Sequence, residues 1–202
     1  MKFGMNLLLW SGGITEEHYP VLEMLKETGF DGVEIPLFEY DADQCAALGK
    51  KLDELGLERT AVTIRKEEDN PISSDPSIRA AGVDQNKQAL ECCQALGASH
   101  LCGPFHSAIG IFSGAGPTAD ELAWGADSMR GVAEHAATCG VTLAVEYLNR
   151  FECYFINTAA DTARFIETVD HPNCKMMYDT FHANIEEKGV AEAIRTCSEH
   201  TV

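Results

Sequence analysis

Short apolar segments alternate with segments of helical periodicity along the whole chain, and this alternation constrains the fold more than any other feature of the sequence. Glycine ends several of the helical segments, at Gly29, Gly56, Gly97 and Gly140. The pattern predicts six β-α units. Strands are expected over 3–10, 32–36, 59–65, 99–105, 141–148 and 174–181, and helices over 15–29, 41–56, 76–97, 118–140, 158–169 and 186–198.

Units of this regularity, with no Pro- or Ser-rich linker between them, predict parallel strands in a single α/β domain. Two architectures compete, because six units complete a doubly wound sheet, whereas a (β/α)8 barrel needs eight units and about 250 residues. The first loop, Ser11-Gly12-Gly13, lacks the GxGxxG pattern of dinucleotide-binding sheets. Glu34, Glu146 and Asp179 each lie near the end of a predicted strand, and such ends converge on one mouth in a barrel. The expected fold is therefore a (β/α)8 TIM barrel, truncated to about six β-α units.

Glu146 and Asp179 are the candidate metal ligands. Glu146 follows the apolar run 141–145, where a carboxylate is costly to desolvate unless a cation or hydrogen-bond donors meet it. Asp179 likewise follows apolar residues of the next predicted strand. Neighbouring strands lie about 5 Å apart, so both carboxylates can reach one ion. Two adjacent acids repel each other without a cation. The alternative for Glu146 is a solvent contact or an ion pair with Arg150.

The charge balance excludes several classes of partner. Fifteen Lys and Arg residues face 32 Asp and Glu residues, a formal net charge of −17, so the surface is expected to repel nucleic acid and anionic membranes. No apolar run approaches the length of a membrane span, and residues 1–10 predict a strand and not a signal peptide. Eight cysteines without a CxxC pair favour reduced thiols and a cytoplasmic location. The oligomeric state stays open, a homo-oligomer included.

Two longer motifs resemble those of a known enzyme family. The run VEYLNRFE at 145–152, followed by FINT at 155–158, is similar to the strand-five signature of the D-tagatose and D-psicose 3-epimerase family, within the xylose-isomerase-like barrels. The run MYDTFHANIEE at 177–187 resembles the strand-six signature of that family, and GVEIP at 32–36 agrees with its second strand. The resemblance runs in register along the chain and implies one xylose-isomerase-like TIM-barrel domain over 1–202, without the last two β-α units.

The resemblance also implies a reaction, which is epimerisation of free ketoses at carbon 3 by proton transfer through an enediolate. A small-molecule sugar is the implied substrate, and a divalent metal ion (Mn, Co or Mg) is the implied cofactor. Glu146 matches the family's metal-binding glutamate that also acts as an acid/base, and Asp179 matches its metal-binding aspartate. Glu152 and His182 match the positions that hydrogen-bond the sugar near its carbonyl end.

The family's remaining site residues have no match: a histidine near strand seven, an acid/base glutamate near strand eight and an arginine. The sequence ends where a seventh strand is expected to begin, so His200 is not assigned as the histidine ligand. Surface or helix-end positions are expected for the other histidines, namely His18, His100, His106, His135 and His171. The alternatives are a sugar or hydroxypyruvate isomerase on the same scaffold, and a non-catalytic fragment or binding module. The negative charge and the lack of a histidine cluster disfavour an endonuclease.

Overall fold

The computed structural model describes residues 1–39 and 41–202. The strands in this part of the chain form one six-stranded sheet. Its strands follow one another in sequence order, and every neighbouring pair is parallel. A doubly wound sheet would reverse its strand order at a switch point, so the sequential order confirms the expected TIM-barrel architecture. The strands are β1 (Gly4–Asn6), β2 (Gly32–Pro36), β3 (Glu58–Val62), β4 (His100–Gly103), β5 (Thr142–Val145) and β6 (Cys174–Met176).

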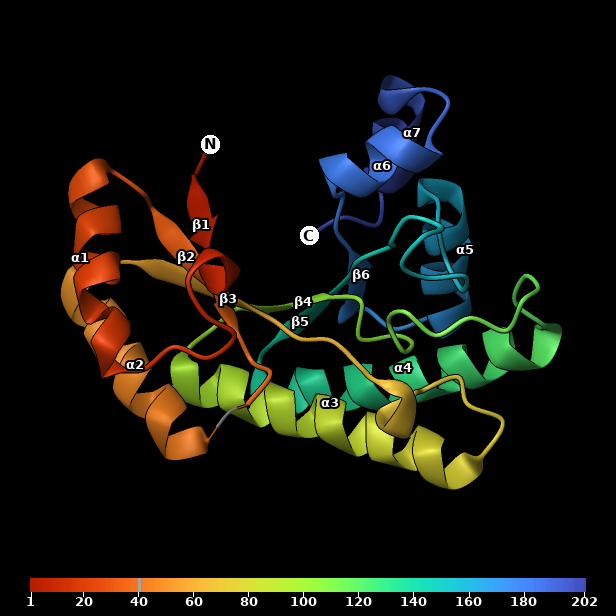
Figure 1. The fold of residues 1–202 in the computed structure, drawn as a ribbon, viewed down its shortest axis with the longest axis horizontal. Helices are drawn as coiled ribbons and strands as arrows, with labels where there is room; N and C mark the ends of the chain where they lie inside the picture. Colours follow the sequence, from red (N-terminus) through yellow and green to blue (C-terminus); the bar gives the residue numbers. More distant parts are fainter. Residues whose placement is uncertain (40) are drawn as a thin grey trace.

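Helices follow the strands and lie around the outer side of the sheet, as Figure 1 shows. Right-handed crossovers between parallel neighbours place successive helices on the same face, which leaves the other face as the barrel interior. The α-helices are α1 (Tyr19–Thr28), α2 (Ala42–Leu55), α3 (Pro76–Leu96), α4 (Ala119–Cys139), α5 (Ala159–Val169), α6 (Thr180–Glu186) and α7 (Val190–Cys197), and the 3-10 turns are η1 (Leu7–Leu9), η2 (Glu16–His18) and η3 (Glu67–Asp69). No helix among the described residues has the length and hydropathy that a membrane span requires.

Local signals set the helix ends where the sequence predicts them. The Asp41 carboxylate accepts hydrogen bonds from the N–H groups of Asp43 and Gln44 at the start of α2. Thr118 and Glu121 form a reciprocal capping box at the start of α4. Helices α1 to α4 each end at a glycine in the left-handed region, a conformation that glycine adopts without steric cost.

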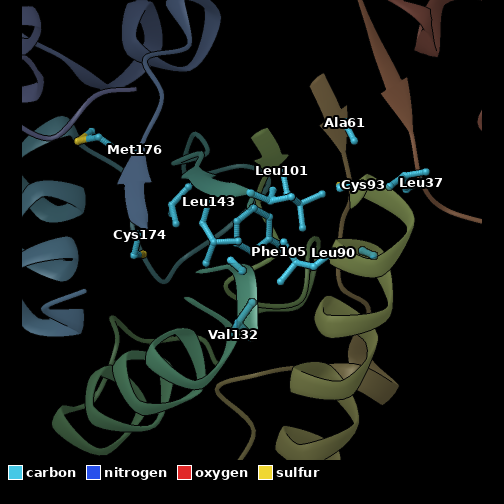
Figure 2. Packing of buried hydrophobic residues seen from close by; sticks show 14 of the residues in the cluster. Leu37, Ala61, Leu90, Cys93, Leu101, Phe105, Val132, Leu143, Cys174 and Met176 are labelled. Carbon is cyan, nitrogen blue, oxygen red and sulfur yellow. The ribbon is translucent and has the colours of Figure 1, made fainter. Parts of the chain in front are cut away.

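The main core lies between the sheet and the helices. Figure 2 shows Phe105 surrounded by Leu101 and Leu143 from the strands, Leu90 from α3 and Val132 from α4. All five side chains are fully buried. Burial of each large apolar side chain stabilises the fold by about 1.5–3 kcal/mol. This packing holds the carboxyl ends of the strands, and the residues that follow them, in fixed positions.

Several elements differ from their predicted extents: the strands predicted over 59–65, 99–105 and 141–148 end at Val62, Gly103 and Val145, and the helix predicted from 15 begins at Tyr19. The strand predicted over 3–10 ends at Asn6, because the Asn6 side chain accepts a hydrogen bond from the Leu8 N–H and starts η1. The strand predicted over 174–181 ends at Met176, since the Asp179 carboxylate caps the short helix α6, which the sequence analysis does not predict. The last helix, predicted from 186, begins at Val190.

The final residues extend the sheet. The Met176 N–H donates to the His200 carbonyl oxygen at 2.9 Å, and Thr201 forms an isolated parallel bridge with Met176. This bridge lies beside β6, where the sequence analysis expects the next strand to begin.

Candidate metal and sugar site

Three side chains meet at the carboxyl ends of β5 and β6. Glu146 directly follows β5, Asp179 is the N-cap of α6, and His182 lies in the first turn of that helix. One ligand atom from each residue, a carboxylate oxygen or a ring nitrogen, lies within 4.8 Å of the other two. The two carboxylates that the sequence singles out are therefore neighbours, because parallel strands bring their carboxyl ends to one edge.

The backbone of Glu146 is held by hydrogen bonds with the last residue of β4 and with the loop that follows it. Its N–H donates to the Gly103 carbonyl at 3.1 Å, and its own carbonyl accepts from His106 Nε2 at 3.0 Å. His106 is fully buried, which corrects the surface or helix-end position expected for it. Burial lowers the pKa of His106 to about 4, so the ring is neutral at pH 7 and Nε2 carries its proton. His106 thus fixes the peptide from which the Glu146 side chain projects.

The Glu146 carboxylate lies in an environment that favours its neutral form in the absence of a cation. Burial, and then the charges of Asp179, Glu34 and Glu152, raise the pKa of Glu146 to about 8. The alternative of an ion pair with Arg150 is wrong, since Arg150 lies 2.7 Å from Glu186 instead.

In the part of the chain that the structure describes, neither Glu146 nor Asp179 pairs with a lysine or an arginine. The two carboxylates therefore repel each other without a cationic side chain to compensate. A divalent cation between them would offset this repulsion, and two carboxylates match the oxygen ligands that hard cations prefer.

The two carboxylate oxygens of Asp179 have different environments. Oδ1 accepts hydrogen bonds from the N–H groups of Phe181 at 2.7 Å and His182 at 2.9 Å, which caps α6. Oδ2 has no hydrogen-bond partner among residues 1–39 and 41–202. One oxygen therefore positions the helix while the other remains available to bind an ion.

Glu152 and His182, the predicted sugar-binding residues, are connected through Asn149. The Asn149 Nδ2 donates to Glu152 Oε1 at 2.6 Å and lies 2.9 Å from His182 Nδ1. His182 Nε2 in turn lies 3.6 Å from Glu146 Oε1. The structure thus brings all four predicted site residues into one group. Sequence reasoning missed Asn149, and its position inside the 145–152 motif is the only signal that points to it.

Two other residues considered in the sequence lie outside this group. Glu34, in the middle of β2, accepts hydrogen bonds from Asn6 Nδ2 at 2.8 Å and Thr60 Oγ1 at 3.0 Å on the flanking strands. Burial raises the pKa of Glu34. His200 Nε2 lies 3.4 Å from Glu167 Oε1, which agrees with leaving His200 out of the metal site.

Comparison with known proteins finds several ketose 3-epimerases among the relatives of this chain. A family model described as Xylose isomerase-like TIM barrel matches residues 22–201. The D-psicose 3-epimerase of Agrobacterium fabrum is 33% identical over 200 residues, which cover 97% of this chain and 69% of that enzyme. The probable ketose 3-epimerase of a Synechocystis species is 30% identical, with 99% and 70% covered. The crystal structure of D-psicose 3-epimerase from Clostridium cellulolyticum H10 with D-tagatose superimposes with a TM-score of 0.90 at 33% identity, covering 100% of this chain and 71% of that one.

Proposed function

Because this chain belongs to the xylose isomerase-like TIM barrel family, and its relatives include several ketose 3-epimerases, we propose that it takes part in epimerising free ketoses at carbon 3. The observation that carries the proposal is the group of Glu146, Asp179 and His182, whose ligand atoms lie within 4.8 Å of one another. In this proposal Glu146 and Asp179 hold a divalent cation, while Glu152 and His182 bind the sugar.

Epimerisation at carbon 3 removes a proton next to the carbonyl group and returns a proton to the opposite face through an enediolate. Glu146 is the group that moves the proton on one face, and a positioned carboxylate of this kind contributes about 10²- to 10⁴-fold to the rate. In this proposal Asp179 only holds the ion, because Oδ1 caps α6 and Oδ2 is the oxygen that would bind the cation. A divalent cation, when bound, supplies Lewis-acid stabilisation of the charge that develops on the sugar oxygens.

The proposal extends to the cation, the domain and the location. Mn²⁺, Co²⁺ or Mg²⁺ fits a site of two carboxylates, since these ions accept oxygen ligands. Residues 1–202 form part of one barrel domain in this proposal, and the enzyme acts in carbohydrate metabolism in the cytoplasm. The location is supported by the eight cysteines, which are all free thiols.

Cation binding is tested by titrating the chain with Mn²⁺ and measuring both calorimetric heat and thermal stability. Wild type is expected to bind, and a ligand present at 100 times its Kd stabilises the folded state by about 2.7 kcal/mol. Asp179→Asn and Glu146→Gln are each expected to lose this stabilisation. Glu167→Gln serves as the control, because Glu167 is exposed and contacts His200 instead of the site. Equal Mn²⁺ affinity in wild type and both site variants would contradict the proposal.

Proton transfer is tested by incubating D-psicose and D-fructose with the chain and Mn²⁺ in D₂O. Glu146 is expected to catalyse exchange of the carbon 3 proton with solvent deuterium, which mass spectrometry and NMR detect even before the opposite epimer accumulates. Glu146→Gln is expected to slow this exchange by about 10²-fold or more. A chain that binds Mn²⁺ but exchanges no proton would favour the binding-module alternative.

A further inference from the structure

The protonation state of one nitrogen decides whether His182 can bind the cation. His182 offers one ring nitrogen to the group, and its Nε2 atom lies 3.6 Å from Glu146 Oε1. Only an unprotonated ring nitrogen binds a metal ion, and in a neutral imidazole one nitrogen carries the proton while the other accepts. The partners of Nδ1 therefore determine the role of Nε2.

Two donors from Asn149 face His182 Nδ1. The backbone N–H of Asn149 donates to Nδ1 at 3.1 Å, and because a backbone N–H cannot accept, Nδ1 holds a lone pair. The side-chain Nδ2 lies 2.9 Å from the same atom. The orientation of this amide is fixed, because its Oδ1 accepts from the Phe151 N–H at 3.0 Å and its Nδ2 donates to Glu152 Oε1. The proton of the neutral ring is therefore on Nε2.

We propose that Asn149 is a positioning residue that holds His182 as the Nε2–H tautomer, so that His182 donates a hydrogen bond at the cation site instead of serving as a third ligand. This inference rests on the proposed function and deepens it, because the Nε2–H group is then directed at a ketose oxygen or at the Glu146 carboxylate. The same Asn149 amide sets the distance between Glu152 and His182, which both bind the sugar in the proposed function.

The contact is built into the fold and does not depend on a ligand. Asn149 is 1% exposed and His182 is 7% exposed, so water has little access to either. The next residue, Arg150, donates to Glu186 from its backbone N–H at 2.7 Å and from its guanidinium at 2.7 Å. Asn149 and Arg150 thereby bind the first and last turns of α6, the helix that Asp179 caps. Turning His182 away from Asn149 would leave the buried Asn149 N–H without its acceptor, which is costly.

The tautomer is measured by long-range ¹H–¹⁵N correlation NMR on the ¹⁵N-labelled chain, with His182→Gln used to assign the signals. The expected spectrum shows a protonated Nε2 and an unprotonated Nδ1 for His182, without metal and after addition of Mg²⁺. A proton on Nδ1 in the neutral ring would overturn the proposal, as would loss of the Nε2 proton on adding Mg²⁺. The metal-free spectrum needs neither turnover nor metal binding, so failure of the proposed epimerase function would leave it readable.

The role of the Asn149 side chain is tested by Asn149→Asp, which keeps the size of the residue but replaces the Nδ2 donor with an oxygen. Because an acceptor then stands in place of Nδ2 while the Asn149 backbone N–H still donates to Nδ1, the His182 ring is expected to shift from the Nε2–H form alone to a mixture that includes the Nδ1–H form. The matched control is Asn157→Asp, in which an amide of the same loop loses its hydrogen bonds to the carbonyl groups of Leu148 and Cys153.

The control is expected to lower stability and to leave the His182 signals unchanged. The positioning role of Asn149 would be overturned if the His182 signals of Asn149→Asp matched those of wild type. It would also be overturned if those signals changed equally in Asn149→Asp and Asn157→Asp. If Asn149→Asp does not fold, the wild-type spectra with and without Mg²⁺ still decide the tautomer.

Discussion

At the scale of single residues, His106 connects the fold to the site through one hydrogen bond. Its ring donates to the carbonyl group of Glu146 while packing near Phe155 and Phe165, with ring centroids 5.7 Å and 6.5 Å away. Such a neutral donor satisfies a buried carbonyl group without bringing a charge into the core. The protonation of His106 therefore affects both the stability of the fold and the position of Glu146.

Stability is expected to fall in mild acid because of His106. Burial lowers the pKa of His106 to about 4 in the folded chain, whereas an unfolded histidine titrates at about 6.5. Between these values only the unfolded chain binds the proton, so the free energy of unfolding decreases as the pH falls from about 6.5 to about 4. The loss amounts to roughly 3 kcal/mol in total. Urea unfolding over this range measures it.

The control for this prediction is His106→Gln, whose amide still donates to Glu146 but does not titrate. Carboxylates such as Glu146 titrate in both proteins, so the difference between them isolates His106. The variant is expected to lose less stability between about pH 6.5 and pH 5. If the free energy of unfolding depends equally on pH in both proteins, the fold does not keep His106 neutral.

At the scale of elements, the contact between α2 and α3 depends on Gly49. A Cβ atom at this position would lie 2.7 Å from the Leu96 carbonyl oxygen and 3.1 Å from its carbon. Both neighbours are backbone atoms, so the helices would have to separate. Gly49→Ala is therefore expected to destabilise the chain by about 1–3 kcal/mol in chemical denaturation.

Gly131 in α4 is the matched helical control, because a Cβ atom there would meet nothing within 4 Å. Gly131→Ala is expected to stabilise the chain by about 0.5–1 kcal/mol, since alanine loses less backbone entropy in a helix. Opposite signs for the two substitutions are the predicted result. If Gly49→Ala and Gly131→Ala destabilise the chain equally, the close approach of α2 and α3 at Gly49 does not explain the effect of Gly49→Ala.

At the scale of the whole molecule, the net charge of −17 affects stability as well as the choice of partners. Like charges repel one another most in the compact state, and salt screens them over about 10 Å at 0.1 M ionic strength. Raising NaCl from about 10 mM to about 0.2 M is therefore expected to raise the Tm at neutral pH. Calorimetry near the isoelectric point of about 4.6 is the control, where no such rise is expected. A Tm that falls with salt at neutral pH would show that surface ion pairs outweigh the repulsion.

The sequence by itself determined the order of the β-α units, most helix ends and the pairing of Glu146 with Asp179. These features depend on signals that are local in the chain, such as the Asp41 and Thr118 caps, or on the general rule that parallel strands end at one edge. The strand predicted over 174–181 is wrong beyond Met176, because the Asp179 carboxylate caps α6 there.

Only the tertiary structure decided the hydrogen bonds that hold the site. His106 and Glu146 are 40 residues apart, and Asn149 and His182 are 33 residues apart. No periodicity or spacing in the sequence indicates such a pair, since each bond depends on loop conformations and side-chain rotamers that packing of the whole chain selects. The sequence therefore identifies the chemical groups of the site, while the fold determines which nitrogen carries a proton and which oxygen remains free to bind an ion.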